Sequence, residues 1–263
     1  MTYVVVFVVI MLAAIAFSFC GVALGRWWIR PYVAEGHNDV LVPIFLTAGV
    51  IYAVLLGFMV VAQLDTYEAA HANVAEEASL LVPMYRQSEV MAADKGAEMR
   101  ALIRDYAKLV AEDWTEFAET SYGSPKARLT VDRIVSVFSS LRPATKAREI
   151  ISQQFLTTFS QLILDRNKRI LAASESLSWI VWVAAIGVGT VVIAMTFILY
   201  ADRYGPHAIM SSILAALIGL LLFLMLVLDH PFRGPLAITP EPFETDSALF
   251  DQIDQDFAKG SSK

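Results

Sequence analysis

The sequence predicts an all-α membrane protein: four transmembrane helices, two plus two, with an intervening extramembrane helical bundle. Four uncharged apolar runs cover residues 3–24, 40–64, 177–201 and 208–228. Charged residues make up only 17% of the chain, below the roughly 25% of soluble domains, and the mean hydropathy is +0.56. Strand-like alternation is scarce in the middle region. We predict four parts: the first transmembrane pair at 1–64, the extramembrane helical region at 65–176, the second transmembrane pair at 177–228 and an acidic tail at 229–263.

The first transmembrane pair covers residues 1–64. Each apolar run exceeds the roughly 20 residues that a helix needs to cross ~30 Å of hydrocarbon. A cleaved signal peptide is the alternative for the first run. It lacks a preceding basic residue, is long for a signal peptide and is followed by no A-x-A site, so we expect a retained helix. The single cysteine, Cys20, excludes internal disulfides.

The middle region, residues 65–176, is expected to be helical. The second apolar run passes through Asp65 and Thr66 with no Gly or Pro until Pro83, which predicts one long helix leaving the membrane. Apolar residues at helical spacing predict further helices over residues 94–119, 129–141 and 144–173, separated by a turn at 121–125 and by Pro143.

The second transmembrane pair covers residues 177–228 and is joined by a short polar link, residues 202–207, which predicts an antiparallel hairpin. Residues 229–263 are expected to form an extended acidic tail, because Pro240 and Pro242 disfavour a helix there. One short amphipathic helix is expected within this tail, from Leu249 to Phe257.

Small residues at four-residue spacing predict surfaces for close helix packing. They are Gly49, Ala53 and Gly57 in the second helix, Ser211, Ala215 and Gly219 in the fourth, and Gly21 and Gly25 in the first. An apolar stripe of Val50, Val54 and Phe58 lies beside the first of these sets. This stripe is either a lipid-facing or packed surface, or a hydrophobic constriction of a pore.

Signatures of enzymes and cofactor sites are missing: the sequence has no Gly-rich phosphate loop, no G-x-S-x-G and no Cys-x-x-Cys. Glu68 and His71 have the Glu-x-x-His spacing of di-iron bundles, but the required second motif is absent. We therefore expect no metal, no cofactor and no enzyme; a membrane-bound metal enzyme is the weakest alternative.

The charge pattern disfavours two further classes of function. The apolar runs contain no ionisable Asp, Glu, Lys, Arg or His, which disfavours an ion-coupled transporter but not a passive pore. The net charge is −6 and no basic stripe is present, which disfavours nucleic acid as a partner.

Two motifs resemble bestrophins. Residues 49–58, followed by Tyr67-Glu68-Ala69-Ala70, resemble the second transmembrane helix of bacterial bestrophins. A motif after the fourth helix resembles their Asp-Pro-Phe-Gly; its residues are Asp229, His230, Pro231, Phe232 and Gly234. Nearly the whole chain is similar to the bacterial bestrophin-like family of domains of unknown function, including the Pro-Glu-Pro-Phe at 240–243.

The resemblance implies an ion channel. Bestrophins are pentameric channels whose second helices line an apolar neck, and the match puts the neck at Val50, Val54 and Phe58. It also implies a homo-oligomer, a pentamer by resemblance, in a lipid bilayer.

Met59 stands where bestrophins have an Arg, and their acidic calcium clasp is not matched in order. Anion selectivity and calcium gating are therefore not implied, and the ion species stays open. The alternative is a non-conducting scaffold or accessory subunit that binds partners through its extramembrane region.

An even number of membrane crossings puts both termini and the extramembrane region on one side. The resemblance predicts that this side is the cytoplasm of a bacterium, with the chain in the cytoplasmic (inner) membrane. Basic residues flank both sides of the helices. Those at the opposite side are Arg26, Arg30 and Arg203; those at the predicted cytoplasmic side are Arg166, Lys168, Arg169 and Arg233.

Overall fold

A computed structural model describes residues 2–28, 35–91, 93–142 and 145–260; Arg30 and Pro143 lie outside these residues. The described residues form helices and no strand, which confirms the all-α class. Four helical spans are long and apolar enough to cross a membrane: Tyr3–Trp28, Asn38–Val90, Trp179–Ile198 and Tyr204–Leu228. The chain divides into a first unit, Met1–Tyr67 with Ser176–His230, and a second unit, Glu68–Glu175 with Pro231–Lys263.

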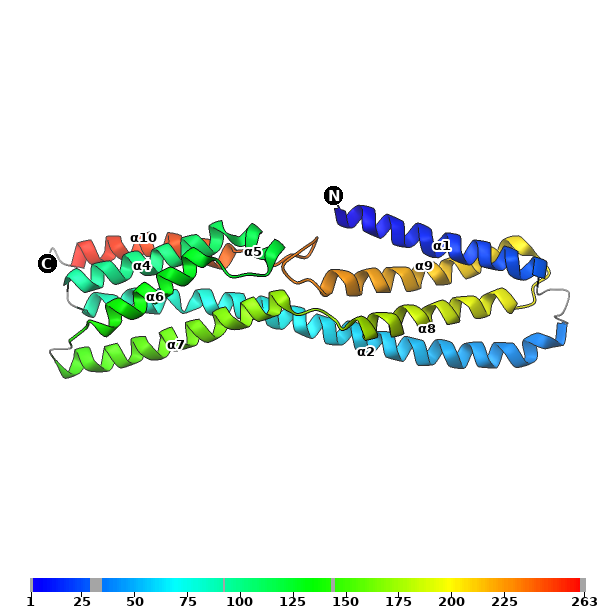
Figure 1. The fold of residues 1–263 in the computed structure, drawn as a ribbon, viewed down its shortest axis with the longest axis horizontal. Helices are drawn as coiled ribbons and strands as arrows, with labels where there is room; N and C mark the ends of the chain where they lie inside the picture. Colours follow the sequence, from blue (N-terminus) through cyan, green and yellow to red (C-terminus); the bar gives the residue numbers. More distant parts are fainter. Residues whose placement is uncertain (1, 29–34, 92, 143–144, 261–263) are drawn as a thin grey trace. The chain divides into compact units, whose positions relative to one another are not determined.

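The first unit contains α1 (Thr2–Trp28), α8 (Trp179–Ile198), α9 (Tyr204–Leu228) and the N-terminal part of α2 (Asn38–Ser79). In this unit α1 packs against α9 and α8, and α8 packs against α9 (Figure 1). The Asn38 side chain joins the start of α2 to the chain that follows α8. Its Nδ2 donates to the carbonyl oxygen of Tyr200, and its Oδ1 accepts from the Tyr200 N–H, both at 2.9 Å.

Close approach of α1 to α8 depends on Gly25. A Cβ at this position would lie 2.4 Å from the backbone oxygen of Phe197, a distance that real Cβ atoms do not show. A Cβ at Gly21 would likewise collide with the Phe197 ring. This ring also meets the Phe17 ring edge-on, at 5.5 Å between centroids. Both glycines therefore let α1 pack directly on the end of α8.

The second unit is a helical bundle. It contains the rest of α2 with α3 (Leu81–Gln87), α4 (Ala93–Glu112), α5 (Trp114–Thr120), α6 (Pro125–Ser139), α7 (Lys146–Ser174) and α10 (Glu241–Gly260). Helix α4 packs against α6 and α10, and α3 packs against α7 and α10. A short 3-10 turn, Ser88–Val90, follows α3 in this unit. Another, Glu35–His37, precedes α2 in the first unit.

The helix predicted over residues 94–119 is two helices. Helix α4 ends at Glu112, and α5 begins at Trp114. Asp113, between them, has φ −87° and ψ 9°, outside the α-helical range, and its carboxylate accepts a hydrogen bond from the Ser124 hydroxyl. The break turns Trp114 and Phe117 towards Phe232, with ring centroids 5.8 and 5.1 Å from it.

The C-terminal segment is more helical than the sequence indicated. An extended stretch was expected at Pro242, whereas α10 begins at Glu241 and includes this proline in its first turn. Proline is tolerated there because the first N–H groups of a helix have no partner within it. Three contacts hold α10 in the bundle: Phe250 stacks on Tyr85 at 4.4 Å, Arg104 pairs with Asp254 at 2.9 Å, and Arg104 also pairs with Asp251.

A buried ion pair lies at the centre of the second unit. Arg169 of α7 contacts Glu77 of α2 through two hydrogen bonds of 2.6 and 3.1 Å, and the Tyr106 hydroxyl of α4 donates to the same carboxylate at 2.6 Å. The guanidinium also lies over the Phe117 ring, 4.8 Å from its centroid. Burial, and next the charge of Glu77, raise the pKa of Tyr106, so this hydroxyl stays a donor.

Candidate functional site

The helix α2 presents an apolar face that the described residues of the first unit leave largely exposed. Val50, Val54 and Phe58 are 64%, 53% and 71% exposed, although all three are large and apolar. Because an α-helix turns about 100° per residue, their four-residue spacing places them on one face. We call these three residues the candidate neck residues.

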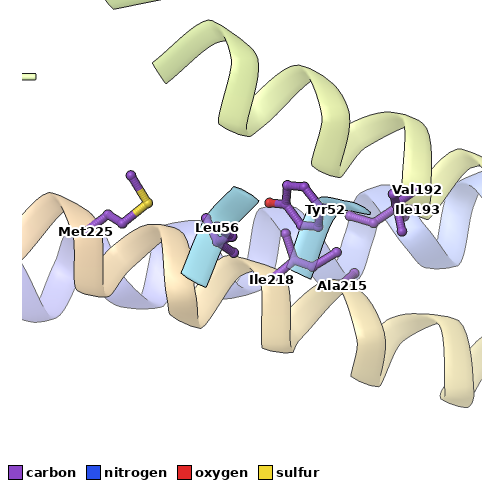
Figure 2. Packing of buried hydrophobic residues seen from close by; sticks show 7 residues of the cluster. All are labelled: Tyr52, Leu56, Val192, Ile193, Ala215, Ile218 and Met225. Carbon is purple, nitrogen blue, oxygen red and sulfur yellow. The ribbon is translucent and has the colours of Figure 1, made fainter. Parts of the chain in front are cut away.

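The opposite face of α2 is buried. Tyr52 and Leu56 are only 4% and 2% exposed, and each follows a candidate neck residue by two positions, about 200° around the helix. Figure 2 shows them packed among side chains from α8 and α9; the cluster also contains Val192, Ile193, Ala215, Ile218 and Met225. This packing fixes the rotation of α2 about its axis, and so determines which face stays free.

Gly189 of α8 makes room for the Tyr52 ring. A Cβ at Gly189 would lie 2.6 Å from the Tyr52 hydroxyl oxygen and 3.0 Å from the ring carbon that carries it. The hydroxyl oxygen is buried and has no hydrogen-bond partner among the described residues. Shape, not hydrogen bonding, therefore holds Tyr52 in this position.

The predicted packing stripes lie in different environments. A Cβ at Gly49 or Gly57 would meet no atom within 4 Å, and Ala53 is exposed, so no other helix of the described chain packs on this stripe. By contrast, Ser211, Ala215 and Gly219 are buried in the first unit. A Cβ at Gly219 would lie 3.4 Å from the Ala14 Cβ, so α1 covers this stripe.

Asp229, the first residue of the post-helix motif, joins three segments of the first unit. Its Oδ1 accepts from Nε2 of Gln63 in α2 at 3.0 Å and from the N–H of Leu177, before α8, at 2.7 Å. Its own N–H donates to the Met225 carbonyl oxygen and ends α9. Both Asp229 and Gln63 are only 6% exposed, so the buried carboxylate fixes α2, α8 and α9 to one another.

The rest of the motif shapes the chain in the second unit. Phe232 is 4% exposed and packs against both the Trp114 and the Phe117 ring. Gly234 has a φ of 93°, which favours glycine, and the Pro231 carbonyl oxygen accepts from the Ile238 N–H at 2.9 Å. His230 is half-buried beside Asp229, with 3.9 Å between Nδ1 and Oδ2.

Glu68 and His71 are exposed on α2. Across the described ranges, no three His, Cys, Asp or Glu side chains are grouped so that they could hold a metal ion. No further ligand is therefore offered to this pair by the described part of the chain.

Sequence reasoning missed two polar sites. Gln63 carries no motif in the sequence, yet it bonds to Asp229, 166 positions later. The sequence places Arg169 among the basic residues that flank the membrane helices, yet Arg169 pairs with Glu77 at 4% and 0% side-chain exposure, respectively. Both lie on the apolar faces of their helices, which was the one signal available in the sequence.

The fold matches known proteins over most of its length. The Bestrophin-like domain family matches residues 11–243. Two crystal structures of single-substitution variants of a bacterial bestrophin homologue from Klebsiella pneumoniae are each 13% identical to this chain with a TM-score of 0.73. The alignments cover 93% of this chain and 98% of the first homologue chain, and 95% and 97% for the second. A third structure of the homologue, solved with zinc phasing, is 14% identical with a TM-score of 0.70, over 92% of this chain and 97% of that one. A search of curated proteins found no match.

Proposed function

This chain belongs to the Bestrophin-like domain family, and on that premise we propose that it forms a homo-oligomeric membrane channel. Ions would pass through an apolar neck lined by Val50, Val54 and Phe58 of α2 from each subunit. The main support is the free apolar face of α2. This face lies on a helix of membrane-spanning length whose opposite face is fixed by Tyr52 and Leu56.

The unpartnered Gly49, Ala53 and Gly57 stripe supports contact between subunits. It lies beside the candidate neck residues, and a neighbouring α2 could approach it closely because glycine has no side chain. A ring of such helices would place the candidate neck residues around a common axis. By resemblance to bestrophins the ring is a pentamer.

An apolar neck controls conduction through hydration. A narrow apolar passage resists filling with water, so ions meet a dewetting barrier. Replacing the three candidate neck residues by Ala widens the passage but leaves it apolar, whereas replacing them by Ser also makes it wettable. Flux should rise severalfold in the Ala variant and further in the Ser variant.

The experiment measures flux from proteoliposomes loaded with KCl, sodium gluconate or choline chloride, so that the permeant ion is identified as well. The matched control replaces Val5, Val9 and Leu12 of α1, which are 57%, 57% and 61% exposed, by Ser. We expect wild-type flux from this control. If neither neck variant conducts more than wild type while both remain folded oligomers, the neck assignment fails and a non-conducting scaffold becomes the better explanation. Equal leak from the control would also contradict the assignment.

The proposed location is the bacterial cytoplasmic membrane, with the second unit in the cytoplasm. The family match and the four apolar spans support an integral membrane protein. The side on which the second unit lies follows only from the likeness to bestrophins, and it is tested by the labelling experiment described in the Discussion.

A further inference from the structure

A pocket in the second unit lies between the C-terminal part of α2 and the segment that leads into α10. Its volume is about 390 Å³, which is within the usual range of ligand-binding pockets. One wall is apolar and contains Val74, Ala78, Ile238 and Pro242. The polar lining includes His71, Thr245, Glu241 and Asp246.

Asp246 is the unusual member of this lining. Its exposure is only 7%, and its Oδ2 is buried without a hydrogen-bond partner among the described residues. Buried carboxylates in proteins are normally paired or hydrogen-bonded, so an unsatisfied one requires a physical explanation. Burial raises the pKa of Asp246 to about 6. At neutral pH the carboxylate is therefore mostly charged in a site that does not compensate it.

The lining supplies no positive partner. The titratable groups that share the lining with Asp246 are His71 from α2 and Glu241 from the start of α10, and the lining contains no Lys or Arg. The lining therefore contains two carboxyl groups and no permanently charged cation. A positively charged ligand in the pocket would find a favourable potential beside Asp246.

The walls indicate what kind of cation fits. A metal ion prefers several oxygen or nitrogen ligands, and no three acidic, His or Cys side chains among the described residues are grouped so that they could hold one. The pocket instead combines one buried carboxylate with an apolar wall. We propose that it binds a small organic cation, an aliphatic ammonium compound whose charged group meets Asp246 and whose carbon chain lies on Val74, Ala78 and Ile238. This proposal does not depend on ion conduction by the chain.

The test uses the full-length protein in detergent and n-butylamine as the probe, with binding measured by calorimetry and by the rise in melting temperature at pH 8. Butanol, which has the same chain without the charge, is the matched ligand control. We expect butylamine to bind and butanol not to bind. Asp246→Asn should weaken butylamine binding at least about tenfold, because the negative charge of the buried carboxylate is lost. Ala75→Leu should also weaken it, since Ala75 is exposed in the lining and a larger side chain would fill the pocket while leaving Asp246 intact.

The pH dependence gives an independent signature. Butylamine stays protonated at pH 5 to 8, whereas Asp246 gains a proton near pH 6, so affinity should fall as the pH is lowered through 6. His71→Gln removes the imidazole from the lining, and the fall should persist in this variant.

Three results would overturn the proposal. The first is that butylamine does not bind at pH 8, which would show that the pocket does not take an aliphatic ammonium compound. Another is stabilisation by calcium chloride that Asp246→Asn abolishes while butylamine has no effect, which would indicate a metal site. The third is dissociation of the oligomer by Asp246→Asn with unchanged butylamine binding, which would place the partner of this carboxylate on a second copy of the chain.

Discussion

Two buried carboxylates in the second unit meet opposite electrostatic conditions. Glu77 contacts the Arg169 guanidinium and the Tyr106 hydroxyl, so its oxygens are fully used. Asp246 has an oxygen without a partner among the described residues. Removing the Arg169 partner of Glu77 should therefore destabilise the protein, whereas removing the charge of Asp246 should stabilise it.

Arg169→Met should destabilise the folded protein by about 3–5 kcal/mol, because it leaves the Glu77 charge buried without its partner. The double variant Glu77→Met with Arg169→Met should lose less, since no unpaired charge remains. Unfolding in detergent, followed by circular dichroism, measures both. Lys146→Met is the control: it removes an exposed ion pair with Glu149 and should cost less than about 1 kcal/mol. A loss for Arg169→Met no larger than this control would contradict the buried pair.

Asp246→Asn should raise the stability of the ligand-free protein at neutral and alkaline pH. The folded-state pKa of Asp246, about 6, lies above the unfolded value of about 3.9. The folded state therefore holds the proton more tightly, and this contribution is complete below pH 4 and is lost as the pH rises through 6. It amounts to at most about 3 kcal/mol.

The measurement compares the melting temperatures of wild type and Asp246→Asn from pH 4.5 to 8, so that groups common to both cancel. The variant should gain on wild type as the pH rises. A difference that does not change with pH would show that this carboxylate is not protonated near pH 6 in the folded protein.

At the scale of elements, α2 has different partners along its length. Tyr52 and Leu56 pack against α8 and α9, Gln63 bonds to Asp229, and Glu77 pairs with α7. The buried face of α2 is therefore set by contacts at several turns. A disturbance at Tyr52 should affect the rotation of the helix and, with it, the direction of the candidate neck residues.

Gly189→Ala should destabilise the first unit by about 1–3 kcal/mol, since the new methyl group would overlap the Tyr52 hydroxyl. Tyr52→Phe alone should be nearly neutral, because the hydroxyl it removes has no partner among the described residues. Combining the two changes should recover part of the loss, because the phenyl ring is shorter by one oxygen. Thermal unfolding of all three variants gives the coupling between the two positions. Strict additivity would mean that Tyr52 and Gly189 do not meet as described.

The elements that the sequence predicted correctly depend on local properties. Four membrane helices follow from run length and absence of charge, and the continuity of α2 follows from the absence of Gly and Pro between Gly57 and Ser79. The break at Asp113 depends on a contact with Ser124 and on packing of Trp114 with Phe232. Such tertiary contacts leave no periodic signal, so the sequence predicted one helix there.

The candidate site was predictable only in part. The four-residue spacing of Val50, Val54 and Phe58 shows that they share a face, but Tyr52 and Leu56 have the same spacing and similar apolarity. Burial of Tyr52 and Leu56 is determined by side chains of α8 and α9, more than 130 positions away. The likeness to bestrophins, not the pattern alone, selected the face that the structure leaves free.

At the scale of the whole molecule, the first unit exposes an extensive apolar surface. Large apolar side chains are exposed along α1, α2, α8 and α9, including Val4, Leu12, Ile51 and Val183 at 57% or more. Soluble monomers rarely expose contiguous apolar patches of this kind. Lipid, or lipid together with further copies of the chain, must therefore cover this surface.

Four crossings make a definite prediction about sidedness. Two crossings separate Tyr122 from Gln252, so both should lie on the same side of the membrane, whereas Asp202, between α8 and α9, should lie on the other. All three residues are exposed, and Cys20 is the only cysteine, so single cysteines can be introduced in a Cys20→Ala background.

In spheroplasts, a membrane-impermeant maleimide should label Asp202→Cys directly. Tyr122→Cys and Gln252→Cys should react only after the membrane is permeabilised, because the second unit is proposed to lie in the cytoplasm. The reverse pattern at all three positions would keep the four crossings but invert the orientation and contradict the cytoplasmic assignment. Labelling of Tyr122→Cys and Gln252→Cys from opposite sides would refute the two-plus-two arrangement, because one of the helices α8 and α9 would then not cross.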